Sequence, residues 1–481
     1  MFVSGRVIGN HYLGLRFVDE ELSNQTSQPP VAGMWGRAKA ALRRLTMTSN
    51  PPFLALFDQA VMSGANLLTA IIVARFCGDE GLGLFTLGMS MVLLANSVQG
   101  SLITTPYTVF LRRQEASDHP LRHAGNALLG FCLLVSLLAL LGIGVAWGWH
   151  MLPGIRVEPS LVWVIVVLIP CFLLRDFARR FEFAHMRMGG ALLVDVGVAT
   201  AQLLSLLILG LQGRLSASVA LATVAISCAA LGLVWLVMRR RAFQFGGRRQ
   251  LAVAMWRDWI FGRWLMVDQL IAVGQINATY WLLALFINPA ATGTLAACST
   301  IAGLPNPLLF GVGNYLAPRF ADTVARGAYA DTMRVYRRSL LGLGTAISVF
   351  TVIAMIFGND LLWLFYQDPA YHGLGLVVGL LALRLMLAVP TISANHAIIA
   401  MEGPRGSAFA SLLGLLATLI TAIPVISMYG VMGAAIALFI GVSVECIFTL
   451  VVFVRYLRSW KWSDGTSRSS AGSDETSENL P

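Results

Sequence analysis

Long apolar segments recur along the whole chain and are separated by short polar connections. A helix that crosses a bilayer needs roughly 20 predominantly apolar residues. Twelve segments meet this need, at 53–76, 83–110, 124–148, 160–177, 190–211, 215–238, 260–287, 292–316, 339–358, 372–400, 405–427 and 430–455. The pattern therefore predicts an all-α polytopic membrane protein with about 12 transmembrane helices.

Basic residues mark alternate connections between these segments. One set of connections, at 77–82, 149–159, 212–214, 288–291, 359–371 and 428–429, holds just two basic residues, Arg156 and Arg214. The other set holds most of the arginines, including the run Arg239, Arg240 and Arg241. Cytoplasmic loops carry an excess of Lys and Arg. The alternation thus predicts an even number of spans, with the N-terminus and the C-terminus both in the cytoplasm.

The composition agrees with a membrane protein and argues against several other classes. Charged residues make up 12% of the chain and hydrophobic residues 57%, whereas a soluble domain carries roughly 25% charged residues. The formal net charge of +10 comes without a nucleic-acid-binding motif, so we assign it to loops that face anionic lipid and expect no nucleic-acid partner. The sequence shows no P-loop, nucleophile elbow or metal-ligand spacing, and its six cysteines are scattered singly. We therefore expect a protein that is not an enzyme and that uses no cofactor or metal.

The first two spans resemble the seventh and eighth after a shift of 210 residues without gaps. Asp58 and Gln59 then fall on Asp268 and Gln269, and further matches include Gly83 with Gly293 and Asn96 with Asn306. Because the shift covers six spans, an even number, both halves begin on the same side of the membrane. They are therefore parallel repeats, related by a pseudo-two-fold axis normal to the membrane. The chain divides accordingly into a cytoplasmic segment with a basic amphipathic stretch (1–52), a first six-helix lobe (53–238), a basic cytoplasmic linker (239–259), a second six-helix lobe (260–455) and a disordered cytoplasmic tail (456–481).

Ionisable residues inside the spans are the first candidates for function, because a charge in the hydrocarbon core is costly unless it faces protein or water. Asp58 and Thr69 share one stripe of the first span, and Asp268 and Thr279 share the equivalent stripe of the seventh. These stripes either line a cavity, where the acids bind a coupling cation or proton, or they hold helices together by hydrogen bonds and dipole contacts. Both interpretations stay open at the level of sequence.

Arg384 lies in the middle of the tenth span, far from either interface. It either binds an anionic group of a substrate or pairs with a buried acid, and Glu445 in the twelfth span is the nearest candidate by depth. Three amides, Asn96, Gln99 and Asn306, also lie inside spans, where they either line a cavity or bond neighbouring helices.

Two stretches resemble the polysaccharide-transporter branch of the multidrug/oligosaccharidyl-lipid/polysaccharide (MOP) flippase superfamily, which includes O-antigen and exopolysaccharide flippases. The first stretch, FLALFDQAVMSGANLLTAIIVARFCGDEGLGLF, runs from Phe53 to Phe85 and is followed by LITTP; the second, LLRDFARRFEFAHMRMGGALLVD, runs from Leu173 to Asp195. The matching positions with polar side chains or glycine are Asp58, Gln59, Ser63, Gly64, Asn66, Arg75, Arg175, Arg179, Arg180 and Asp195.

The resemblance implies a bacterial inner-membrane flippase with two six-helix lobes. Such a protein moves an undecaprenyl-pyrophosphate-linked oligosaccharide to the outer leaflet for surface polysaccharide biosynthesis, including lipopolysaccharide. It implies substrate contacts for Asn66, Arg75 and the arginines Arg175, Arg179 and Arg180, which suit a pyrophosphate because Arg binds phosphate bidentately. These three arginines have the alternative of being ordinary cytoplasmic loop charges. Asp58 and Asp195 are candidates for a coupling ion.

Three functions follow from these observations. The leading hypothesis is a flippase that works by alternating access, whose partners are the lipid-linked oligosaccharide, membrane lipids and the polysaccharide polymerase or export machinery. The alternative is a cation-coupled exporter of the multidrug and toxin extrusion (MATE) type, in which Asp58, Asp268 and Glu445 would dominate. A membrane polymerase or ligase is a third class, and the short outer loops argue against it.

Overall fold

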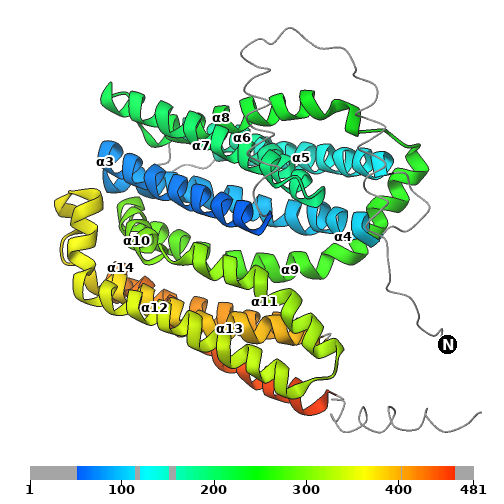
Figure 1. Cartoon of the computed structure of the whole chain (residues 1–481). Helices are drawn as coiled ribbons and strands as arrows, with labels where there is room; N and C mark the ends of the chain where they lie inside the picture. Colours follow the sequence, from blue (N-terminus) through cyan, green and yellow to red (C-terminus); the bar gives the residue numbers. More distant parts are fainter. Residues whose placement is uncertain (1–50, 114–119, 151–158, 402, 461–481) are drawn as a thin grey trace, which may run out of the picture. The chain divides into compact units, whose positions relative to one another are not determined.

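The computed structural model describes residues 51–113, 120–150, 159–401 and 403–460, and these residues form helices throughout. Figure 1 shows them as a stack of long helices. The first half contains α3 (Pro51–Gln99), the π-helix η1 (Gly100–Thr104), α4 (Thr105–Arg113), α5 (Pro120–His150), α6 (Pro159–Ala184), α7 (Met188–Leu211), α8 (Ala217–Arg239) and η2 (Arg240–Ala242). The second half contains α9 (Arg248–Phe286), α10 (Pro289–Ala302), α11 (Asn306–Ala325), α12 (Tyr329–Tyr366), η3 (Pro369–Tyr371), α13 (Gly375–Ala400) and α14 (Pro404–Ser459). We call the two halves the N-lobe and the C-lobe.

Two of the helices are hairpins that cross the membrane twice. α3 has 49 residues and α14 has 56, far more than the roughly 20 that one crossing needs. Each breaks at a glycine with positive φ, 71° at Gly78 and 55° at Gly430, a conformation that glycine adopts without steric cost. In α3 both arms return to one place, since Asp58 pairs with Arg179 while Gly100, just past the other end, lies against Arg180.

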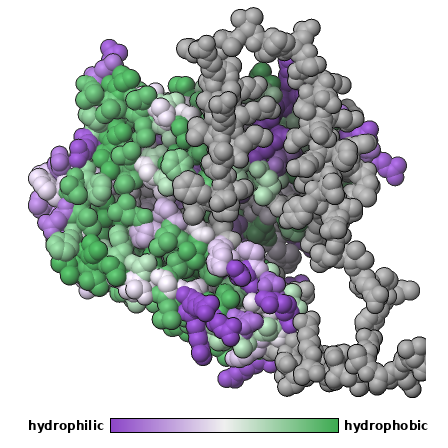
Figure 2. Space-filling view, viewed as in Figure 1, coloured by the Kyte–Doolittle hydropathy of each residue, from purple (hydrophilic) through white to green (hydrophobic). Residues whose placement is uncertain are grey.

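The predicted all-α polytopic fold is confirmed. Nine helices of the described part are long and apolar enough to span a membrane. α10 and α11, bent by 55° at their break, can form one more span together. With a second crossing for each hairpin, the described residues account for the predicted twelve. Large apolar side chains such as Leu140, Ile226 and Leu285 are exposed, and Figure 2 shows hydrophobic residues over much of the visible face. A bilayer accepts such a surface.

The two lobes meet at a reciprocal contact between glycines. A β-carbon on Gly83 would lie 1.8 Å from the carbonyl oxygen of Pro289, and one on Gly293 would lie 1.9 Å from that of Asp79. Gly83 and Gly293 are partners in the 210-residue repeat, and so are Asp79 and Pro289. Gly83 thus contacts Pro289, the repeat-equivalent of Asp79, and Gly293, the repeat-equivalent of Gly83, contacts Asp79 itself. A two-fold axis produces this kind of reciprocal contact. The contact supports the duplication inferred from sequence.

The lobes share a hydrophobic core at one end of the molecule. We call this the hairpin end, since it contains the bend at Gly78, and we call the opposite end, with Arg180 and Arg239, the arginine end. One buried cluster joins N-lobe residues such as Val73 to C-lobe residues such as Tyr366, while a separate cluster fills the arginine end of the C-lobe. The two lobes are thus fused by packing at the hairpin end and have distinct cores at the arginine end, where α9 contacts η1 and α4.

Candidate functional site

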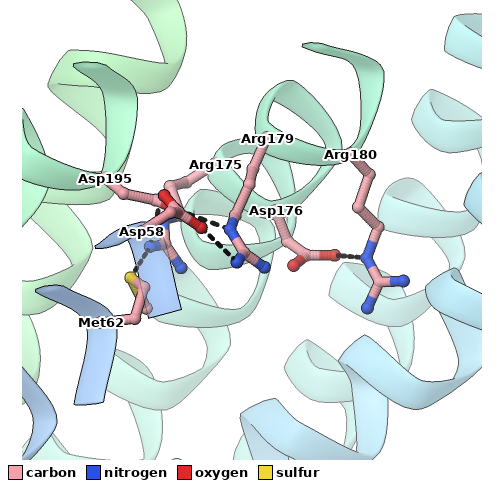
Figure 3. Close-up of polar contacts among 7 residues, drawn as sticks. All are labelled: Asp58, Met62, Arg175, Asp176, Arg179, Arg180 and Asp195. Carbon is pink, nitrogen blue, oxygen red and sulfur yellow. Dashed lines mark hydrogen bonds and ion pairs between the residues drawn. The ribbon is translucent and has the colours of Figure 1, made fainter. Parts of the chain in front are cut away.

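A network of paired charges lies inside the N-lobe (Figure 3). Arg175 and Arg179 are four residues apart and so project from the same face of α6. Arg179 donates from Nη2 to Asp58 of α3 at 2.7 Å and from Nε to Asp195 of α7 at 2.6 Å. Arg175 donates to the other oxygen of Asp195 and contacts the sulfur of Met62. Both aspartates are almost fully buried, with exposed fractions of 1% and 0%.

Arg175 and Arg179 are therefore engaged by buried carboxylates of other helices. The network joins α3, α6 and α7 and balances two positive charges with two negative ones inside the lobe. Removing one partner of a buried pair leaves an uncompensated charge and costs about 3–5 kcal/mol. The geometry makes Asp58, Asp195, Arg175 and Arg179 a structural clamp in the described conformation.

Arg180 differs from its neighbours on α6. It pairs with Asp176 one helical turn earlier at 2.6 Å, and 38% of its side chain is exposed. Its guanidinium lies beside Gly100, where η1 interrupts the α-helical winding of the second span. Of the three arginines that the resemblance implied, Arg180 is the one with an accessible guanidinium at the arginine end.

The C-lobe holds Asp268, the repeat-equivalent of Asp58, in a cluster of different composition whose charges form no ion pair among the described residues. Glu445 of α14 accepts a hydrogen bond from Ser411 at 3.2 Å and interacts electrostatically with Asp268 of α9 and Arg384 of α13. Within the described residues none of these three charges has an ion pair within 4.0 Å, and Nε of Arg384 is buried without a hydrogen-bond partner. Tyr280 of α9 is the other neighbour of Arg384. The cluster is a set of two acids and one base held in proximity but not closed.

The remaining candidates are spread over several places. Gln99 donates to the carbonyl oxygen of Leu173 at 3.1 Å and so bonds α3 to α6. Asn96 has a buried amide oxygen without a partner, while Asn66 is exposed and Asn306 starts α11 at the break of the eighth span.

Arg75 lies at the hairpin end, outside both clusters. Its Nε donates to the carbonyl oxygen of Phe365 at 2.9 Å and its Nη2 to that of Leu364 at 3.4 Å. Both carbonyls belong to the last turn of α12, where a cation compensates the partial negative charge of a helix C-terminus. Arg75 therefore connects the N-lobe to the C-lobe.

Sequence reasoning missed a further buried acid of the N-lobe. Glu182 is fully buried and accepts from Trp235 Nε1 at 2.8 Å and from Nε and Nη2 of Arg239 at 2.8 and 2.9 Å. Its place one turn after Arg179 on α6 was the available signal, but the predicted span ended at 177 and left it in a loop. No cluster of three or more potential metal ligands occurs among the described residues.

Comparisons with known proteins identify the fold of this chain. No protein-family model and no curated protein matches the chain. Among solved structures, an inward-facing multidrug resistance MATE transporter of the MOP superfamily matches with a TM-score of 0.65 at 13% identity, over 84% of this chain and 95% of that one. The MATE multidrug transporter DinF-BH in complex with R6G matches with a TM-score of 0.64 at 16% identity, over 90% and 98%. A point mutant of the Vibrio cholerae MATE transporter VcmN matches with a TM-score of 0.56 at 14% identity, over 87% and 98%. With twelve crossings in two lobes, the chain has the fold of the MATE transporters of the MOP superfamily.

Proposed function

We propose that the protein is an alternating-access transporter that moves a lipid-linked oligosaccharide with an anionic pyrophosphate across the bacterial inner membrane. The observation that carries this proposal is Arg384. A guanidinium held within a membrane span, with no ion pair to an acid among the described residues, is a ready partner for an anionic group. A drug exporter specialised for cations gains nothing from an unpaired positive charge at that place.

The distribution of the hydrophobic cores supports alternating access. Rocking of two lobes requires that they pack together at one membrane face and separate at the other. The shared core at the hairpin end and the distinct cores at the arginine end favour opening toward the arginine end, although α9 of the C-lobe packs on η1 and α4 of the N-lobe there. If loop charge orients the chain as predicted, the state open at that end faces the cytoplasm.

The two clusters suggest a division of labour within this mechanism. Arg180, partly exposed at the arginine end, would receive the pyrophosphate first, and Arg384 would hold it deeper in the membrane. Asp268 and Glu445 are the better candidates for a coupling cation, because Asp58 and Asp195 already hold arginines. A cation between the two C-lobe acids would change the field at Arg384 and so couple ion binding to substrate binding.

Replacing Arg384 tests the proposal. In a deletion strain complemented with Arg384→Gln, we expect surface glycan to be lost and the lipid-linked precursor to accumulate in the inner leaflet. Arg214→Gln, an exposed arginine at the hairpin end, is the matched control and should restore surface glycan. Normal surface glycan with Arg384→Gln at wild-type protein levels would overturn the role of Arg384.

A MATE-type drug exporter is the second candidate, favoured by the proximity of Asp268 and Glu445 in a chain with this fold. For this function the deletion strain would keep its surface glycan and become sensitive to cationic dyes. Precursor analysis and dye sensitivity in one deletion strain therefore separate the two functions.

A further inference from the structure

The first half of α9 has one face that packs on the N-lobe. Gly262 meets η1 so closely that a β-carbon would lie 2.3 Å from the carbonyl oxygen of Ser101. The ring of Phe261 lies 5.5 Å from that of Phe110 in α4, centroid to centroid, and the guanidinium of Arg257 lies 4.1 Å from the same ring. These contacts fix one side of the helix against η1 and α4.

The other face of this segment is exposed and follows a regular pattern. Val253, Trp256, Ile260 and Trp264 have exposed fractions of 65%, 65%, 47% and 63%. At about 100° per residue they lie within about 40° of Ile260 around the helix. Arg249 and Arg263 are exposed too and lie within about 60° of the same direction. We call these six residues the α9 stripe.

The depth of the α9 stripe is set by the packing of the opposite face. The 39 residues of α9 extend about 58 Å, while the hydrocarbon core is about 30 Å thick. The contact between Gly262 and Ser101 brings this part of α9 beside η1, where Arg180 lies against Gly100. The stripe is therefore at the arginine end, and it extends about 22 Å along the helix from Arg249 to Trp264.

The residues of the stripe suit lipid headgroups better than water or hydrocarbon alone. Tryptophan is enriched at membrane interfaces because its ring is apolar and its N–H is polar. Arginine matches phosphate with two parallel donors. The acid nearest in sequence, Asp258, points about 160° away from Ile260 and contacts Arg257, so the stripe itself carries positive charge alone.

We propose that the α9 stripe is a binding surface for anionic phospholipid headgroups. Trp256 and Trp264 contact the lipid, and Arg249 and Arg263, about 21 Å apart along the helix, bind the phosphates of different lipids. The charge complementarity selects anionic over zwitterionic lipid, in agreement with the net charge of +10 of the chain. This inference does not depend on the transported substrate.

Fluorescence quenching by brominated lipid tests this surface directly. The full-length protein is reconstituted into phosphatidylcholine vesicles with increasing fractions of brominated phosphatidylglycerol, and tryptophan quenching is recorded at low salt. Brominated phosphatidylcholine in the same host gives the zwitterionic reference. Each arginine near an anionic surface contributes about 1 kcal/mol, or about fivefold in affinity. Arg249→Gln with Arg263→Gln should therefore need about 25 times more phosphatidylglycerol for the same quenching, while Arg214→Gln behaves as wild type.

The double variant Trp256→Phe with Trp264→Phe identifies where phosphatidylglycerol binds. It should lose the tryptophan quenching that brominated phosphatidylglycerol produces at low mole fraction in the wild type. Equal quenching of the wild type by both brominated lipids would overturn the proposal. So would an unchanged response of the double arginine variant. If that variant does not fold, the wild type decides alone, since its preference for phosphatidylglycerol must decline as salt is raised.

Discussion

The two lobes come from one duplicated unit and treat their buried charges in opposite ways. In the N-lobe, Asp58 is held by Arg179, and that arginine is shared with Asp195. In the C-lobe, the equivalent Asp268 has no arginine within ion-pair distance among the described residues, and Arg384 keeps a buried Nε without a partner. Acids and arginines that form ion pairs hold helices together, whereas charges without an ion pair have capacity to bind a ligand. The comparison supports the proposal that the N-lobe charges act as a scaffold and that those of the C-lobe bind.

The contrast arises in the fourth and fifth helices of each lobe. At the repeat shift of 210 residues, Val389 stands in place of Arg179, and Arg405 stands in place of Asp195. The acid on the first helix is thus present in both halves, while its partners are present in one. A buried acid without a partner costs stability, which is the pattern expected where function maintains it.

The largest expected effect is on the clamp of the N-lobe. Arg179→Met leaves Asp58 and Asp195 without their common partner, and we expect a loss of about 3–5 kcal/mol in stability. The measurement is the fraction of protein that stays monodisperse in detergent after heating, compared with Arg334→Met, whose ion pair with Asp331 lies within one helix and is exposed on both sides. Equal stability of the two variants would contradict the structural role of the network.

The next effect concerns the pseudo-two-fold contact between the lobes. Gly83→Ala and Gly293→Ala each place a methyl group within 2 Å of a carbonyl oxygen and should each cost about 1–3 kcal/mol, because the close packing must open. The matched controls are Gly64→Ala and Gly274→Ala, another repeat-related pair, which have no atom within 4 Å of the new methyl group. The symmetry itself is tested by comparing Gly83→Ala with Gly293→Ala, which should lower the unfolding temperature by similar amounts.

A smaller effect is expected for the bond between Arg75 and the end of α12. A cation at a helix C-terminus contributes about 0.3–1 kcal/mol at an exposed position, and Arg75 is exposed. Arg75→Gln should therefore lower thermal stability slightly, and more at low ionic strength than at high, because salt screens the interaction. Arg214→Gln at the same end supplies the baseline for an arginine without a contact to α12. A salt-independent loss would point to packing rather than to the helix terminus.

These comparisons also show what the sequence could predict. Apolar length and loop charge were sufficient for the twelve crossings, because membrane spans follow from hydrophobicity alone. The repeat identified Asp58 and Asp268 as equivalents, yet it could not tell that one is clamped and the other is not. Which arginine reaches which acid depends on the rotation of α6 and α7 against α3, and twelve similar apolar helices leave that rotation undetermined. Glu182 was missed for a related reason, since the predicted span ended before it and α6 continues to Ala184.

The smallest expected change in stability is at Arg384, and it sharpens the comparison most. The side chain lies in the interior with its Nε unbonded, so Arg384→Gln removes a desolvated charge without breaking an ion pair among the described residues. We expect thermal stability that is unchanged or slightly raised, in contrast to Arg179→Met, because replacing an unpaired buried charge relieves a cost instead of creating one. Measuring both variants side by side in the same detergent distinguishes a charge that stabilises the fold from a charge that binds substrate. Strong destabilisation by Arg384→Gln would mean that Glu445 and Arg384 form a structural pair after all. Preserved stability together with lost transport would place the anion-binding function in the C-lobe.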